Sequence, residues 1–135
     1  MIIQKEIKLK EKPRGVHLVT DEIMSHLGEL PDQGMLHLFV KHTSAGITLN
    51  ENADPSVRTD FERFMNDLVP EDYDFDHTSE GSDDMPAHIK TAIFGNSVCI
   101  PITNGRLNTG TWQGIYLGEF RDHGGSRKIL ATVYS

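Results

Sequence analysis

Residues 97–134 read SVCIPITNGRLNTGTWQGIYLGEFRDHGGSRKILATVY, and this stretch indicates the type of fold. It contains three segments of strand composition, at Ser97 to Thr103, Trp112 to Arg121 and Lys128 to Tyr134. Residues 122–126, DHGGS, have the composition of a hairpin connection, so we expect the last two strands to pair directly. This part of the chain therefore predicts antiparallel β-structure.

Further strands and helices precede this stretch. Apolar and polar residues alternate from Met1 to Lys10, and two more strand candidates, which a tight bend would pair, are Gly34 to Lys41 and Thr43 to Asn50. Helices are predicted over about ten residues from a Thr20 cap, from Asp54 and Pro55 to Leu68, and from Asp84 and Pro86 to about Phe94. This order of elements predicts an α+β fold with antiparallel or mixed sheets and two to three helices, in one domain spanning residues 1–135.

The excess of negative charge is concentrated in one segment. Of the 20 Asp and Glu residues, seven lie between positions 71 and 84, where no Lys or Arg occurs, and the formal net charge is -7. Such a segment is either a solvated loop or a source of negative electrostatic potential that attracts a metal or a cationic substrate. Nucleic-acid binding is disfavoured because it needs clustered cations.

The hydropathy pattern and the single cysteine indicate the compartment. No apolar run approaches the roughly 20 residues that cross a bilayer, so we expect a cytoplasmic protein without membrane contact. Cys99 has no second cysteine to pair with, which fits a reducing compartment. Its apolar neighbours predict a buried, inert thiol.

Three histidines stand at polar junctions between the predicted elements. Carboxylates and hydroxyls surround His42, His77 and His88 in sequence. Asp84 and His88 are four residues apart at the start of a predicted helix, so they share one face and suit a shared metal or a carboxylate–imidazole pair. Several imidazoles favour zinc or another transition metal over magnesium, which prefers oxygen ligands and stays an alternative. Because the spacings match no structural zinc motif, the sequence predicts a catalytic metal or a proton-transfer site.

Two carboxylates and one hydroxyl near the first polar junctions are further candidates. Glu51 and Asp54 either act in catalysis or cap the helix that follows them. Ser44 is a weaker catalytic candidate, because His42 stands where a G-x-S-x-G nucleophile motif requires glycine.

Residues 105–113, GRLNTGTWQ, are a candidate oxyanion-binding segment. Gly105 and Gly110 have the spacing of a phosphate loop, but Thr111 and Trp112 replace the lysine and the hydroxyl residue of a triphosphate loop. The backbone amides of the segment, together with Arg106, are suited to hold an oxyanion. The indole of Trp112 is expected in the core rather than at a ligand.

The motifs of the chain resemble those of the YjbQ-like family. The resemblance covers nearly the whole chain and rests on Ser97, Ile100, Ile102, Gly105, Gly110 to Gln113 and Ile115, and on the runs His42 to Ala45 and Ala87 to Lys90. It implies a β-sandwich-like α+β fold packed around the threefold axis of a homotrimer, with polar pockets near the subunit boundaries. Family proteins are described as secondary thiamine-phosphate synthases, which weakly join a pyrimidine pyrophosphate to a thiazole phosphate.

The resemblance also singles out residues by motif position. The motif histidines map onto His42, His77 and His88, and the motif acids map onto Glu51, Asp54 and Glu80. The oxyanion-binding candidates are then Gly105, Arg106, Thr111, Trp112 and Gln113. Asp84 stands where many members carry asparagine.

Three functions follow as hypotheses. The first is a weak thiamine-phosphate-synthase-like transfer, with a divalent cation on the departing pyrophosphate and Arg106 on the phosphates. The second is a metal-dependent hydrolase or lyase that uses a metal-activated water, with Glu51 or Glu80 as the general base. A histidine-rich centre fits this second hypothesis better than the first. The third is a non-catalytic trimer that binds a small phosphorylated or anionic metabolite through Arg106 and nearby amides.

Overall fold

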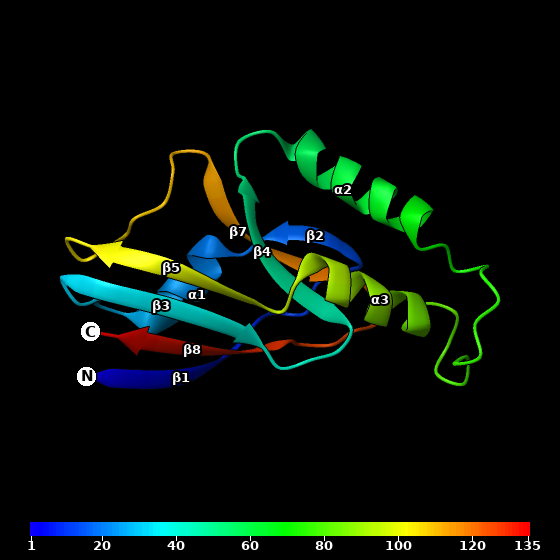
Figure 1. The fold of residues 1–135 in the computed structure, drawn as a ribbon, viewed down its shortest axis with the longest axis horizontal. Coiled ribbons are helices and arrows are strands. Elements are labelled where there is room, and N and C mark those ends of the chain that lie inside the picture. The colour runs from blue at the N-terminus through cyan, green and yellow to red at the C-terminus, as the bar shows by residue number, and fades with distance from the viewer.

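A computed structural model describes all residues 1–135 and shows two antiparallel sheets with three helices (Figure 1). The strands are β1 (Ile2–Lys8), β2 (Gly15–Leu18), β3 (Gln33–Val40), β4 (Ala45–Glu51), β5 (Ser97–Thr103), β6 (Arg106–Leu107), β7 (Gln113–Glu119) and β8 (Lys128–Tyr134). The helices are α1 (Thr20–Leu27), α2 (Pro55–Leu68) and α3 (Asp84–Phe94). The predicted α+β class is confirmed, and every strand pair is antiparallel.

The two sheets separate strands that are neighbours in sequence. The larger sheet has the order β1-β8-β3-β5-β6, and the smaller sheet has the order β2-β7-β4. The predicted pairing of residues 34–41 with residues 43–50 is wrong, because β3 pairs with β5 and β8 while β4 pairs with β7. The predicted hairpin at residues 122–126 is also wrong, since β7 and β8 belong to different sheets. Both turns connect two layers, so each sheet contributes one face to a shared core.

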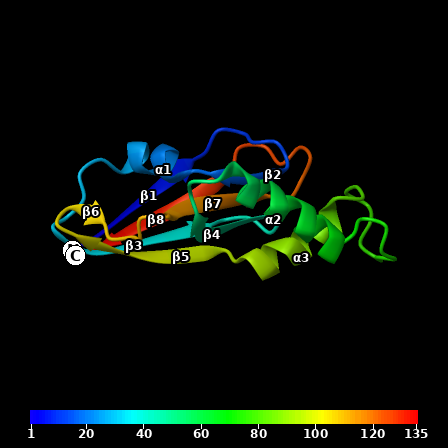
Figure 2. The ribbon, with the colours of Figure 1, turned by 90° about the horizontal axis from the view of Figure 1, so that it is seen from above.

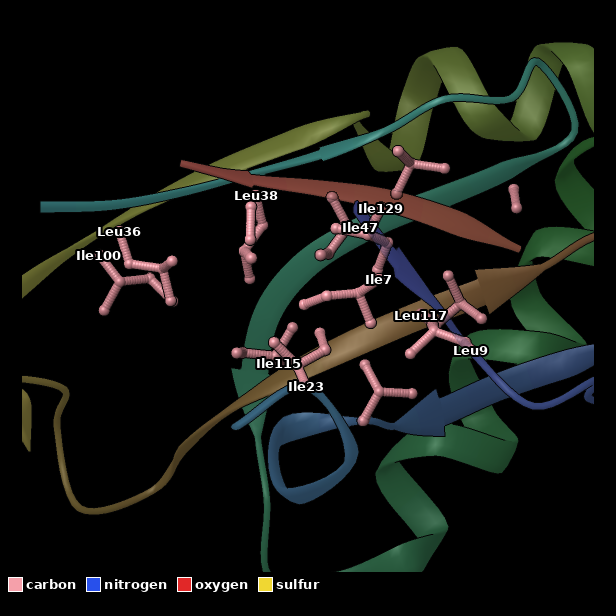
Figure 3. Close-up of a cluster of buried hydrophobic side chains, with 14 of the residues drawn as sticks. Ile7, Leu9, Ile23, Leu36, Leu38, Ile47, Ile100, Ile115, Leu117 and Ile129 are labelled. Atoms are coloured by element: carbon pink, nitrogen blue, oxygen red, sulfur yellow. The ribbon is translucent and has the colours of Figure 1, made fainter. Parts of the chain in front are cut away.

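A cluster of 15 buried apolar residues fills the space between the sheets. Its largest side chains come from both sheets and from α1, and most of them are labelled in Figure 3. Strand alternation sends Ile115 and Leu117 of β7 to this core and Tyr116, between them, to the opposite face of the strand. The smaller sheet is therefore buried on both faces.

Helices α2 and α3 cover that second face and lie at the end of the molecule away from the termini (Figure 1, Figure 2). Met65 of α2, Ala87 of α3 and Phe120, which follows β7, form a second buried cluster. Phe94 at the end of α3 packs edge-to-face on Phe120, with the ring centroids 5.4 Å apart. These contacts hold α3 against the smaller sheet.

A glycine in β4 permits the close approach of α3. A Cβ atom on Gly46 would lie 2.5 Å from the carbonyl oxygen of Gly95 and 3.0 Å from Cδ1 of Phe94. The same Gly95 oxygen accepts a hydrogen bond from Ile47 N at 2.9 Å. The end of α3 is thereby fixed over the start of β4, which places the helix beside residues 42–44.

Several local expectations were wrong. Thr20 does not cap a helix, because it is the first residue of α1 and its Oγ1 accepts a hydrogen bond from Ile115 N at 2.8 Å. Cys99 is exposed because it lies on the outer face of β5, and the side chain of Trp112 is 65% exposed. The short strands β2 and β6 were not predicted. None of the helices combines the length and the apolar character that a membrane span requires.

Candidate metal centre

Asp84 and His88 lie one turn apart on α3, and His77 reaches them from the loop before the helix. Asp84 Oδ2 is 2.8 Å from His77 Nε2 and 3.3 Å from His88 Nε2. One ligand atom from each of the three residues lies within 4.8 Å of the other two. The four-residue spacing puts Asp84 and His88 on one helix face, as the sequence predicted. Two imidazoles and one carboxylate around one point are a ligand set that suits a transition metal.

Arg121 holds the carboxylate of this group in place. Its Nη1 donates to Asp84 Oδ1 at 2.8 Å, its Nε donates to Asp83 Oδ2 at 3.0 Å, and its Nη2 donates to the carbonyl oxygen of Glu80 at 2.8 Å. The hydrogen bond to Asp83 raises the pKa of the Arg121 guanidinium above its ordinary value. Because the Asp84 side chain is only 5% exposed and its Oδ1 is occupied, Oδ2 is the atom left to face the imidazoles.

The carbonyl group of Thr43 decides which nitrogen of His88 carries a proton. Thr43 O lies 2.8 Å from His88 Nδ1, and a carbonyl oxygen can only accept, so Nδ1 donates. In the neutral ring, Nε2 then has a lone pair that faces Asp84 Oδ2 at 3.3 Å. Two acceptors this close repel one another unless a proton or a metal ion lies between them. The site is therefore built to hold positive charge at this point.

His42 lies outside this group. Lys128 N donates to His42 Nε2 at 2.8 Å, so the lone pair of that nitrogen is already engaged. Burial, together with the nearby Arg127 guanidinium, lowers the pKa of His42 below its ordinary value. The structure thus brings together His77 and His88 of the three predicted histidines, with Asp84 as the third member. Their role as metal ligands stays a prediction.

An open pocket of about 550 Å³ adjoins His88. It lies between the residues that precede β4 and the second half of α3, and its lining includes His42, Thr43, Thr91 and Asn96. His42 and His88 both line the pocket, so a molecule bound there would lie against both histidines.

Glu51 and Asp54 lie at the opposite end of β4 from Thr43. The length of β4 separates the two ends by about 20 Å. Glu51 accepts hydrogen bonds from Asp54 N at 3.1 Å and 3.0 Å through its two carboxylate oxygens, and Asp54 accepts one from Ser56 N at 2.9 Å. The bond from Ser56 holds the pKa of Asp54 below its ordinary value. Both carboxylates thus accept hydrogen bonds from backbone amides at the start of α2. Capping of this helix was the alternative that the sequence offered to a catalytic role.

Ser44 and Glu80 also lie outside the group of His77, Asp84 and His88. The Ser44 hydroxyl and carbonyl oxygens accept hydrogen bonds from Arg127 Nη2 at 2.9 Å and 3.1 Å, so the hydroxyl serves a buried ion pair. Glu80 contacts Arg121 through its backbone oxygen, and its carboxylate is exposed and makes no hydrogen bond. Of the predicted acids, Glu80 has the carboxylate that is free to act.

The oxyanion-binding candidates are not near the histidines within this chain. Gly105 lies in the turn between β5 and β6, and Arg106 begins β6, so both are at the far end of β5 from Asn96, about 20 Å along the strand. Residues 110–113 precede and begin β7, where Gln113 Oε1 accepts a hydrogen bond from Gly110 N at 2.8 Å. Thr111, Trp112 and Gln113 are exposed beside the start of α2.

Sequence reasoning missed the contacts that Arg121 and Thr43 make in the site. A signal for Arg121 existed, because the acidic segment 71–84 contains no base and must find cations elsewhere in the chain. The structure supplies them through Arg121 and through Arg14, which pairs with Glu71 and Asp122. No sequence signal identifies the carbonyl of Thr43, because every residue has such a group.

Comparisons with known proteins agree on one family. Residues 5–135 match the family described as UPF0047 protein YjbQ-like. The chain is 54% identical over 135 residues to the UPF0047 protein YjbQ of Escherichia coli O157:H7, covering 98% of each protein. It is 40% identical to UPF0047 protein MJ1081 of Methanocaldococcus jannaschii, over 89% of this chain and 85% of that protein.

Solved structures give the same result for the fold. A YjbQ/UPF0047 protein of Clostridium acetobutylicum superposes with a TM-score of 0.79 at 36% identity, over 98% of this chain and 99% of that one. A YbjQ-like protein of unknown function from Sulfolobus solfataricus P2 superposes with a TM-score of 0.84 at 22% identity, over 98% of this chain and 96% of that one. The second likeness concerns the fold alone.

Proposed function

This chain belongs to the UPF0047 protein YjbQ-like family, and we propose that it is a metal-dependent hydrolase or lyase in which His77, Asp84 and His88 bind a divalent transition-metal ion. The observation that carries the proposal is the pair of acceptors formed by His88 Nε2 and Asp84 Oδ2, 3.3 Å apart. Thr43 directs the Nδ1 proton of His88 away from the carboxylate, so either a second ring proton on Nε2 or a metal ion must lie between the two atoms, and the proposal assigns the metal ion to this place.

The separations of Asp84 Oδ2 from the two imidazole nitrogens fit a tetrahedral ion after a small adjustment. Ligand atoms that each lie 2.0–2.1 Å from a tetrahedral ion are about 3.3 Å from one another. The His88–Asp84 separation already has this value, whereas the 2.8 Å separation between His77 and Asp84 is that of a hydrogen bond. His77 lies on a loop with its side chain 51% exposed, so it can move outward when its proton is replaced by a metal. Two nitrogen ligands favour zinc or a similar ion over magnesium.

Three protein ligands leave one position of a tetrahedral ion for water or substrate. An ion in such a site polarises a substrate oxygen and lowers the pKa of water to about 7. Arg121 and Thr43 would orient the aspartate and the histidine, as outer partners of metal ligands commonly do. Glu80, whose carboxylate is free, is our candidate for the general base, because Glu51 is committed to the start of α2.

Zinc titration of protein purified without an affinity tag and stripped by a chelator tests the centre. We expect one zinc ion per chain by calorimetry, and an affinity reduced by about 100-fold or more in His88→Gln and Asp84→Asn. His26→Gln is the matched control, because His26 lies on α1 and its side chain makes no hydrogen bond. The proposal is wrong if the wild-type chain binds no zinc, or if His88→Gln binds it as tightly as the wild type does.

Hydrolysis of activated phosphate and carboxylate esters by the zinc-loaded chain tests the activity. Turnover that follows the zinc occupancy and disappears in Asp84→Asn is the expected result. Turnover that persists after chelation would assign the reaction to another site.

Thiamine-phosphate-synthase-like transfer is the second proposal, and it rests on the family resemblance. This transfer would need a cationic side chain that binds phosphate next to the metal centre. Arg106, the candidate for that role, lies at the far end of β5 in the same chain. Incubation of both phosphorylated substrates with wild type and with His88→Gln distinguishes the two. Product formed at the same rate by both proteins would show that the transfer activity does not depend on His88.

We also propose the homotrimer that the resemblance implies. Its support here is the outer face of the larger sheet, where Met35, Phe39 and Tyr134 are 37%, 39% and 44% exposed. Apolar side chains grouped on one sheet face are typical of protein interfaces. Sedimentation equilibrium at micromolar concentration should give three times the mass of one chain, and a monomer mass would overturn the proposal.

A further inference from the structure

The pocket beside His88 contains hydrogen-bonding groups that have no partner inside the protein. The Oγ1 atom of Thr91 is buried without a hydrogen bond, although the residue lines the pocket. Asn96 lines the same pocket, and only its backbone oxygen is hydrogen-bonded, to Val40 N at 2.9 Å. Polar groups that a fold leaves unpaired in a concave site are the usual means of binding a small polar ligand.

The ring of His42, which also lines the pocket, is held as a hydrogen-bond donor. Because Lys128 N donates to Nε2 at 2.8 Å, that nitrogen has no proton, and the proton of the neutral ring is on Nδ1. Burial, followed by the nearby Arg127 charge, lowers the pKa of His42, so the ring is neutral at physiological pH. Nδ1 is then the one polar atom of this ring that is available to a ligand.

The charges around His42 favour an anion. Lys41, Arg127 and Lys128 all act on His42 as positive neighbours, and Glu119 is the acid that opposes them. Glu119 forms a buried pair with Arg127, and Lys41 and Lys128 share the one carboxylate of Glu6, at 3.0 Å and 3.7 Å. These five residues together therefore keep one excess positive charge.

We propose that this pocket binds a small oxyanion, a phosphate or a carboxylate, one oxygen of which accepts a hydrogen bond from Nδ1–H of His42. The inference deepens the proposed function, since it names the substrate class of a ligand that lies between His42 and the centre at His88. It makes His42 a substrate-binding residue and not a metal ligand. The exposed side-chain amide of Asn96, which lines the pocket, supplies a further hydrogen bond to the same ligand.

Inorganic phosphate and acetate, titrated separately into the metal-free protein, test the proposal by NMR. We expect at least one of them to shift the amide signals of Thr43, Thr91 and Asn96 in a saturable way. His42→Ala removes the imidazole and with it the Nδ1–H donor, so it should weaken binding of that anion about 10-fold or more. His26→Ala is the matched control and should bind as the wild type does. The proposal is overturned if neither anion shifts these signals, or if His42→Ala binds with unchanged affinity.

A second measurement uses only the wild-type protein. Long-range proton–nitrogen spectra at pH 7.5 should show the His42 proton on Nδ1, and that nitrogen should shift when the anion is added. A proton on Nε2, or an Nδ1 signal insensitive to a saturating anion, would overturn the proposal. Because these measurements need no metal, zinc binding without anion binding would defeat this inference alone, and anion binding without zinc binding would defeat the proposed metal centre alone.

Discussion

Replacement of Arg127 by methionine should cost this protein a large part of its stability. Arg127 Nε and Nη2 donate to the two carboxylate oxygens of Glu119 at 2.7 Å and 2.6 Å, and the side chains are 6% and 0% exposed. Arg127→Met would leave Glu119 buried, with only the Arg121 N–H at 3.1 Å as a donor. Removal of one partner of a buried ion pair costs about 3–5 kcal/mol. For a chain of this size the loss corresponds to roughly 10–20 °C in Tm.

Urea denaturation followed by circular dichroism measures this loss. Arg63→Met is the matched control, because Arg63 pairs with Asp60 on the exposed face of α2 and should change the free energy of unfolding by less than about 1 kcal/mol. The double variant Glu119→Leu with Arg127→Met should lose less stability than Arg127→Met alone, since it buries no unpaired charge. A loss below about 1 kcal/mol in Arg127→Met would refute the reasoning, as it would show that Glu119 finds water or another donor.

Other changes test the contacts that position the site. Gly46→Ala should destabilise the protein by about 1–3 kcal/mol in urea denaturation, because its Cβ would meet the Gly95 oxygen at 2.5 Å; an unchanged midpoint would mean that α3 shifts freely. Arg121→Lys should weaken zinc binding about 10-fold to 100-fold by calorimetry, and equal affinity would show that the guanidinium does not orient the aspartate ligand. Burial opposes ionisation of Glu22, but hydrogen bonds, chiefly from Lys12, outweigh it and lower the pKa of Glu22 below its ordinary value. Its stabilisation should therefore be present near pH 7 and disappear as the pH falls below about 4, so the stability difference between wild type and Glu22→Gln should shrink with acid; a constant difference would contradict this.

Much of the secondary structure followed from local patterns. The helices that became α2 and α3 were predicted from an aspartate and proline at the start and an apolar stripe, and six strands were placed by apolar runs or by alternation of apolar and polar residues. Short strands such as β2 were missed, because four residues carry too little periodicity to distinguish a strand from a loop. Trp112 was misplaced, since apolar character gives a preference for burial but not a position in the fold.

The three histidines of the predicted site also show which features follow from local sequence and which depend on the fold. The sequence by itself determined the family, the α+β class and the shared face of Asp84 and His88, because motifs, element order and helical spacing are properties of a continuous stretch of chain. Only the tertiary structure decided that His77 joins this pair and that His42 does not. The reason is that a ring nitrogen is free or engaged according to its hydrogen-bond partner, and here these partners come from distant segments: a carbonyl before β4 for His88 and the first amide of β8 for His42. Strand pairing was decided in the same way, since a turn between two apolar runs does not reveal whether it joins neighbours in one sheet or crosses to the other layer.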